Sequence, residues 1–183
     1  MDLRRNGRIL YISSVDVSVG NGPGVNEREF ILALYAAVGD RAHFLIPQPM
    51  AEITDLPSQV CTFSLPHWRH HPLYFPAHVV SVIRHADELL SRRKFDLLLF
   101  RFDVLPLAPL YITKRHPIPY VAKTLGQGAL NVLAEKGGWL GRSLEGVNRW
   151  LFKQLMARAL VADSCSPIQV EYLPAKVFIL LLL

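Results

Sequence analysis

Residues 95–102 constrain the fold more than any other segment, because this run is apolar at nearly every position. A strand with one face in water alternates apolar and polar side chains, whereas a strand covered on both faces is apolar almost throughout. Asp96 and Arg101 are the only charged residues in the run. The segment therefore predicts a strand inside a parallel sheet that has helices on both sides.

Similar runs alternate with helical segments along the rest of the chain. Further strands are predicted at 8–14, 42–46, 60–65, 119–123 and 160–166. Apolar residues recur at helical spacing in the intervals 26–38, 77–93, 106–115 and 139–159. Strands that alternate with helices of this length are joined by right-handed crossovers. The predicted fold class is α/β, a single Rossmann-like domain with a doubly wound, mostly parallel sheet.

The predicted topology also indicates where a site would lie. We expect the strands near 9–13, 97–102, 119–123 and 161–165 to be central in the sheet. Ligands of such sheets bind beyond the carboxyl ends of the strands. The functional surface is therefore expected in the loops that follow these strands.

Composition excludes several classes of protein. The chain has 183 residues, of which 51% are hydrophobic and 19% charged, which is too apolar for a disordered chain. Two cysteines, Cys61 and Cys165, are too few for a secreted disulfide scaffold. We find neither a run long enough to span a membrane nor a secretory signal, so we expect a cytoplasmic protein. A net charge of +5 without a long basic block gives little support to nucleic-acid binding.

Three glycines, Gly20, Gly22 and Gly24, lie between the first predicted strand and the first predicted helix. Free N–H groups and the dipole at the start of a helix favour an anion. The spacing G-x-G-x-G differs from the dinucleotide fingerprint G-x-G-x-x-G, and no acid ends the next strand, which is followed by Pro47. A phosphate-facing loop, a simple connecting turn and a nicotinamide site remain as alternatives.

Other chemistry-bearing residues complete no motif. His67, His70 and His71 cluster in a proline-rich stretch without a cysteine or carboxylate beside them, so we assign no metal and no cofactor. The hydrolase motif Gly-x-Ser-x-Gly is absent, and no histidine lies near Cys165. Hydrolase chemistry is therefore not indicated.

The predicted helix at 139–159 is amphipathic. Leucine or valine occupies positions 140, 144, 147, 151 and 155, and Arg142, Arg149 and Lys153 form a basic line. A surface helix of a globular domain shows this pattern when its apolar stripe faces the core. A basic amphipathic helix can also lie on anionic lipid, so peripheral membrane contact is the alternative.

Four segments resemble motifs of one family, in the family's order. Residues 24–34 are similar to a Gly-Gly-x-Glu-Arg helix start, and 90–99 to a helix leading into a Lys-x-Asp strand. Residues 118–126 resemble an Ile-Pro-x-Val strand ending in Thr-x-His-Gly, and 158–166 the last strand before the domain crossing. The chain thus resembles the N-terminal domain of family-four glycosyltransferases with the GT-B fold. It departs from the family at Val25, where the second glycine is expected, and at Leu125, where a histidine is expected.

The resemblance implies the acceptor-binding half of a glycosyltransferase, with a nucleotide-sugar donor and an acceptor as partners. It further implies a loop that faces the donor diphosphate, and three candidate partners for the charge of that diphosphate. The loop residues are Gly20, Gly22, Gly24 and Arg28, and the candidate charge partners are Arg101, Lys123 and Gly126. For each cation the alternative is an ordinary surface residue. A non-catalytic Rossmann-like module that binds a partner or an anion, and a nicotinamide-dependent enzyme, remain as alternatives for the whole chain.

The domain assignment follows from the same resemblance. Residues 1–176 correspond to the acceptor-side domain, and 177–183 form an apolar tail that suggests a truncated product. Family members hold the donor through a Glu-x7-Glu motif in a second domain, and no two glutamates in this sequence are eight positions apart. We therefore expect no sugar transfer by residues 1–183 alone. The expected location is the cytoplasm, with peripheral contact at the inner membrane face.

Overall fold

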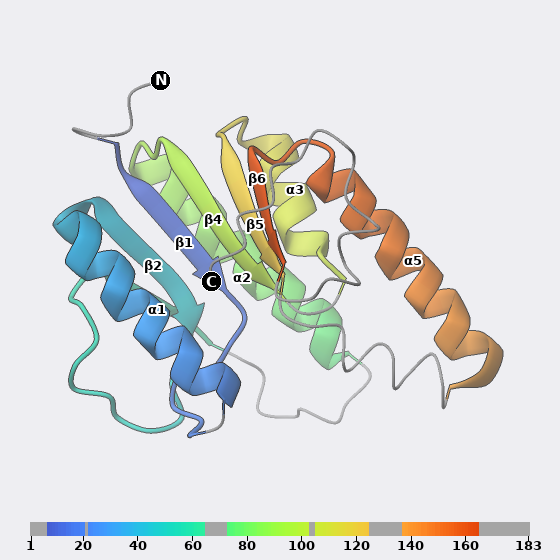
Figure 1. Cartoon of the computed structure of the whole chain (residues 1–183), viewed down its shortest axis with the longest axis horizontal. Helices are drawn as coiled ribbons and strands as arrows, with labels where there is room; N and C mark the ends of the chain where they lie inside the picture. Colours follow the sequence, from blue (N-terminus) through green and yellow to red (C-terminus); the bar gives the residue numbers. More distant parts are fainter. Residues whose placement is uncertain (1–6, 21, 65–72, 103–104, 125–136, 165–183) are drawn as a thin grey trace. The chain divides into compact units, whose positions relative to one another are not determined.

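A computed structural model describes residues 7–20, 22–64, 73–102, 105–124 and 137–164 (Figure 1). The strand order in its sheet is β3-β2-β1-β4-β5-β6. The pairs β1–β2, β2–β3 and β5–β6 are parallel. The fold is therefore the predicted Rossmann-like α/β class. Contacts divide the chain into two compact units, 1–99 and 100–183, and each unit is described by itself below.

The first unit contains three complete strands and the start of a fourth. These are β1 (Ile9–Ser13), β2 (Ala42–Pro47), β3 (Val60–Phe63) and β4 (Leu97–Phe102), which crosses the boundary between the units. Ile9 is in register with Ala42, and Phe44 with Val60. Strands β1, β3 and β4 lie within predicted runs, because short β-branched and aromatic segments favour a pleated, buried backbone. Strand β2 continues one residue beyond its predicted end at Ile46, to Pro47.

Helices α1 (Gly22–Val38) and α2 (Tyr74–Arg92) lie on opposite faces of these strands, as Figure 1 shows. Helix α1 begins four residues before the predicted start at Asn26, so the prediction that Gly22 and Gly24 precede the helix was wrong. Pro23 is tolerated there because the first N–H groups of a helix need no partner within the helix. The predicted end is confirmed, since Gly39 follows with a left-handed φ of 60° and starts the 3₁₀ turn Gly39–Arg41.

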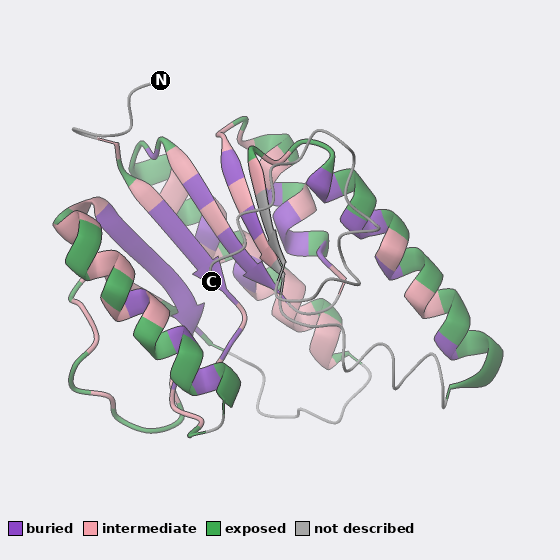
Figure 2. Ribbon diagram, in the orientation of Figure 1, coloured by how far each residue is buried: buried purple, intermediate pink, exposed green. Residues whose placement is uncertain are grey.

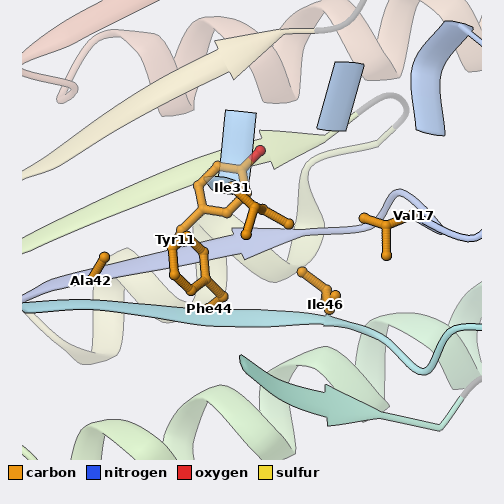
Figure 3. Packing of buried hydrophobic residues seen from close by; sticks show 6 residues of the cluster. All are labelled: Tyr11, Val17, Ile31, Ala42, Phe44 and Ile46. Atoms are coloured by element: carbon orange, nitrogen blue, oxygen red, sulfur yellow. The ribbon is translucent and has the colours of Figure 1, made fainter. Parts of the chain in front are cut away.

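The core of the first unit lies between α1 and the sheet. Every residue of β2 is buried, as Figure 2 shows, and the central cluster joins strands and helix. Its members are Tyr11, Val17, Ile31, Ala42, Phe44 and Ile46. In Figure 3 the Tyr11 side chain extends from β1 toward Ile31 on α1. The Tyr11 ring lies 5.0 Å from Phe30 and 6.2 Å from Phe44, measured between ring centroids. Burial of these side chains fixes α1 against β1 and β2.

The second unit contains the rest of β4 and four further elements. They are α3 (Leu107–Arg115), β5 (Tyr120–Thr124), α5 (Gly138–Met156) and β6 (Val161–Ser164). The Phe102 and Phe152 rings lie 5.2 Å apart, which packs α5 against the end of β4. Strand β6 stands at one end of the described strand order, so the expectation of a central strand near 161–165 was wrong. Its four residues pair in register with β5, from Val121 opposite Val161 onward.

Candidate functional site

A cavity of about 400 Å³ lies beside the loop that follows β1. Three segments of the first unit line it: the loop after β1, the first half of α1, and the connection between β2 and β3. The lining residues are Val17, Ser18, Val19, Gly20, Val25, Arg28, Glu29, Leu32, Ala51, Glu52, Ile53 and Asp55. This is the carboxyl end of β1, where the sequence predicts a site.

Short polar contacts hold the loop after β1 in place. The Asp16 carboxylate accepts hydrogen bonds from the Ser18 amide at 3.0 Å and from the Ser18 hydroxyl at 2.6 Å. The Ser18 hydroxyl oxygen in turn accepts from the Met50 amide at 3.0 Å. The Ser13 hydroxyl accepts from the Val15 amide at 3.1 Å. Ser18 therefore connects the two loops that face each other across the cavity.

Gly24 differs from Gly20 and Gly22 in how closely it packs, a difference that the glycine spacing in the sequence did not indicate. A Cβ at Gly24 would lie 2.2 Å from the Val19 carbonyl oxygen and 3.0 Å from that of Asp16. A Cβ at Gly20 or Gly22 would meet nothing within 4 Å. Gly24 is therefore the glycine that lets the first turn of α1 approach the loop after β1.

Arg28 is held at the rim of the cavity by Asp55. Its Nε lies 3.1 Å from each Asp55 carboxylate oxygen, and its Nη2 lies 2.6 Å from Oδ2. The two side chains are 45% and 42% exposed. The hydrogen bonds from the guanidinium keep the pKa of the Asp55 carboxyl below its usual value. The pair links α1 to the connection between β2 and β3, which are two of the three segments that line the cavity.

The cavity combines apolar walls with an acidic rim. Val17, Val25, Leu32 and Ile53 supply apolar surface, and the lining also holds three acidic residues, Glu29, Glu52 and Asp55, against one arginine. A surplus of carboxylates repels an anion, while carboxylates accept hydrogen bonds from hydroxyl groups. The lining therefore suits a neutral ligand that bears hydroxyl groups and has an apolar face.

The sequence analysis missed the buried carboxyl group of Glu27. Glu27 is fully buried, and its Oε1 accepts a hydrogen bond of 2.7 Å from the Tyr11 hydroxyl. Helical spacing contains the signal, because Glu27 lies four residues before the buried Ile31 and so on the same face. The contact joins the first turns of α1 to β1.

The loop after β4 carries a second feature that the sequence did not indicate. Leu105 has a φ of 45°, which is uncommon for a residue other than glycine. Its amide donates a 2.7 Å hydrogen bond to the side-chain oxygen of Asn148 on α5, and Asn148 is 2% exposed. The buried side-chain amide of Asn148 therefore holds the Leu105 backbone in a strained conformation within the second unit.

The predicted site residues fall into three groups. Gly20 and Arg28 line the cavity, and Gly22 and Gly24 form the first turn of the adjacent helix. Arg101 on β4 and Lys123 on β5 both belong to the second unit. Arg101 is 4% exposed, and Lys123 is half-buried and in register with Asp163. Gly126 and the histidines at 67, 70 and 71 lie outside the described residues. Arg101 is thus not an ordinary surface cation.

Comparison with known proteins finds similar architectures among solved structures. No protein-family model matches the chain, and no curated protein sequence matches it. Solved structures do match. Sucrose-phosphate synthase from Thermosynechococcus elongatus superposes with a TM-score of 0.62 at 12% identity, over 90% of this chain and 44% of that protein. The fold is similar to that of one half of a GT-B glycosyltransferase.

Two further structures show the same likeness. The Anabaena protein HepE, in complex with UDP and glucose, matches with a TM-score of 0.54 at 16% identity. UDP-N-acetylglucosamine 2-epimerase from Rickettsia bellii matches with a TM-score of 0.54 at 14% identity. Both matches cover 94% of this chain and 43% of the other protein. The chain thus spans less than half the length of these structures, and at such identities the likeness bears on the fold alone.

Within the parts of the chain that the structure describes, no helix has both the length and the apolar composition that crossing a bilayer requires.

Proposed function

We propose that this chain is the acceptor-binding half of a GT-B glycosyltransferase that uses a nucleotide-sugar donor. The observation that carries the proposal is the cavity beside the glycine loop, at the carboxyl end of β1 in a fold like that of GT-B halves. The similar structures include a protein bound to UDP and glucose, which supports a ligand of this class. In this proposal the donor is held mainly by a second Rossmann-like half.

The acceptor occupies the cavity in this proposal. Sugars present hydroxyl groups at their edges and apolar C–H groups on their faces. The carboxylates of Glu29 and Glu52 accept hydrogen bonds from the hydroxyl groups, and Val25 and Leu32 contact the apolar face. A neutral or amine-bearing sugar fits the acidic rim better than a sugar phosphate does.

The donor diphosphate lies outside the cavity, at the start of α1. Gly20 and Gly22 present backbone rather than side chains there, and their surroundings leave space for a close approach. Backbone N–H groups at a helix start stabilise negative charge that develops on a leaving diphosphate. Arg28, already tied to Asp55, then stands between donor and acceptor and can contribute one of its donors to either ligand. Arg101, Lys123 and Gly126 remain candidate partners for the donor charge.

Ligand binding by the purified chain tests the acceptor role. Saturation-transfer NMR with a panel of neutral and amino sugars, sugar phosphates and UDP is the measurement. We expect neutral or amino sugars to receive saturation and sugar phosphates to receive less. Val25→Trp should abolish the signal, because Val25 is 44% exposed and its enlarged side chain fills the cavity. Val80→Trp is the matched control on α2, where Val80 is 64% exposed outside the cavity.

Several outcomes would contradict the proposal. One is the absence of any saturation-transfer signal from a sugar. Another is a sugar signal from the Val25→Trp variant equal to that from the natural chain. The third is a preference for phosphorylated ligands that the variant retains. Transfer itself is measured with the chain alone and with the chain joined to a donor-binding half. We expect turnover only in the second case, because closure of two halves assembles the site and excludes water. Turnover of a nucleotide sugar by residues 1–183 alone would contradict this division of roles.

A further inference from the structure

A group of basic side chains lies at the amino edge of the sheet in the first unit. Strands β1 and β2 are parallel and begin together at this edge (Figure 1). His43 is the second residue of β2, Arg8 directly precedes β1, and Arg93 directly follows α2. These three residues, here called the basic triad, come from three segments that are far apart in the sequence.

His43 is the buried member of the triad. It is 9% exposed, and its ring packs edge-on against Phe95, with the ring centroids 5.4 Å apart. Its Nδ1 lies 3.3 Å from Nη1 of Arg93. A guanidinium has N–H donors and no acceptor, so Nδ1 accepts this hydrogen bond. The His43 imidazole is therefore neutral, with its proton on Nε2.

The surroundings of His43 oppose a positive charge on its ring. Burial, followed by the positive charges of Arg93 and Arg8, holds the pKa of His43 below its usual 6.5. The negative charge of Asp40 acts in the opposite direction, and its effect is the smallest of the four. Three groups that bear or can acquire a positive charge thus lie close together at one edge of the sheet.

The two carboxylates near this edge are already engaged. Asp40 Oδ1 accepts hydrogen bonds from the Tyr35 hydroxyl at 2.9 Å and from Gln59 Nε2 at 2.6 Å. Asp96 Oδ2 accepts a 2.8 Å hydrogen bond from the Arg8 amide. Among the residues that the structure describes, neither the Arg8 guanidinium nor that of Arg93 forms an ion pair with a carboxylate. The triad therefore has unused capacity to donate hydrogen bonds to an anion.

This arrangement suits a compact anion with two negative charges. Arg8 and Arg93 are exposed, so both can meet a ligand from solvent. A guanidinium donates two parallel hydrogen bonds to the oxygens of a phosphoryl group. A proton on Nδ1 of His43 is unfavourable while only cations lie beside the ring, and it becomes favourable once a dianion lies there. Protonation of the ring and binding of the anion should therefore support each other.

We propose that the basic triad binds a phosphoryl dianion, either inorganic phosphate or a phosphomonoester, and that His43 takes up a proton from solvent as the anion binds. Arg93 then turns its guanidinium from His43 Nδ1 to the anion, Arg8 binds the anion from the side of β1, and the protonated Nδ1 donates a third hydrogen bond. This site is separate from the acceptor cavity. His43 lies about 13 Å of strand away from Pro47, at the other end of β2.

NMR of the histidine rings in the full chain tests the proposal. Sulfate is the first probe, because it keeps two negative charges through the titration, whereas phosphate changes its own charge near neutral pH. The chain has seven histidines, and His43→Gln identifies the signals of His43. If that variant does not fold, the ring contact with Phe95 identifies them in nuclear Overhauser spectra.

We expect sulfate to move the titration of His43 to higher pH than chloride does at equal ionic strength. Sulfate should also bind roughly tenfold more tightly at about pH 5 than at about pH 8, the effect of one added hydrogen bond between charged groups. The ring signals of His85 should respond equally to both salts, because His85 Nδ1 lies 2.8 Å from the Ser81 carbonyl oxygen on α2. Phosphate and methyl phosphate are then compared at neutral pH, and the tighter of the two identifies free phosphate or a phosphomonoester as the ligand.

Substitutions assign the binding to the triad. Arg8→Gln and Arg93→Gln should each weaken sulfate binding about tenfold, since each removes a charged hydrogen-bond donor. Lys94→Gln is the matched control, because it removes the same charge from an exposed residue next to Arg93, and binding should stay within about twofold of the natural chain. Circular dichroism of each variant checks that the fold is retained.

Four results would overturn the proposal. Failure of sulfate to bind would exclude the site, and equal movement of the His43 titration by sulfate and chloride would mean that salt only screens the arginines. A loss of binding in Lys94→Gln as large as in Arg93→Gln would indicate a diffuse positive field. Sulfate affinity that does not change between about pH 5 and about pH 8 would mean that His43 takes up no proton with the anion.

Discussion

Gly24→Ala tests the account of the glycine loop most directly. Elsewhere in a helix this substitution stabilises by up to about 1 kcal/mol, because alanine is the better helix former. At Gly24 the new Cβ would lie 2.2 Å from the Val19 carbonyl oxygen, and ordinary contact begins at 3.4 Å. The helix start or the loop must then move by roughly 1 Å, the difference between these distances. Both obstructing atoms belong to the backbone, so no side chain can rotate away.

We expect the net cost to lie near the upper end for overpacked sites, about 3 kcal/mol. For a chain of this size that loss lowers the melting temperature by about 6–12 °C. Urea unfolding followed by circular dichroism, together with calorimetry, measures both quantities. Gly22→Ala is the matched control, since its Cβ has open space, and we expect a change within about 1 kcal/mol. A Gly24→Ala variant that melts within about 2 °C of the natural chain would refute the close-approach argument.

Three further predictions concern groups with defined partners. Tyr11→Phe should destabilise the chain by about 1–3 kcal/mol in urea unfolding, because the buried Glu27 carboxyl loses a donor. Asp55→Asn should lower stability slightly at neutral pH, since Arg28 keeps the Asp55 pKa below its usual 3.8. That difference should persist above the usual pKa and vanish as pH falls through the lowered value, as acid titration of both chains can show. Burial raises the pKa of Tyr120 to about 12, so stability should fall as pH rises from 10 toward 12, and Tyr120→Phe should remove this loss in alkaline unfolding curves.

The alternation of apolar runs was enough to predict the fold. The nearly continuous run at 95–102 indicated a strand covered on both faces, and β4 lies between β1 and β5 in the strand order. The strand at 161–164 was misplaced because the composition of a short run does not distinguish an edge strand from a central one. The start of α1 was misplaced because glycine and proline lower helix propensity, while tertiary contacts with the loop decide where the first turn forms.

The candidate site was predictable only in part. Helix and strand order indicated that the glycine loop lies at the carboxyl end of β1, and the family resemblance added Arg28 to it. Gly20 and Arg28 both line the cavity. The partner of Arg28 was not predictable, because Asp55 lies 27 positions away in an irregular connection. Glu27 and Asn148 were missed for a different reason. A polar residue in a helix is normally interpreted as solvent-facing, and only the packed structure shows which polar side chains face inward.

The connection between β2 and β3 has a consequence for the divergence of related chains. The strands on either side are fixed by their own pairing, while residues 51–55 supply one wall of the cavity. Ile53 and Leu56 pack against the core, and polar contacts at the surface link the connection to the loop after β1 and to α1. Lengthening a surface connection costs little free energy, since closure entropy grows only slowly with length. Homologues can therefore exchange this segment around two apolar anchors and acquire a new ligand preference while inheriting the same sheet.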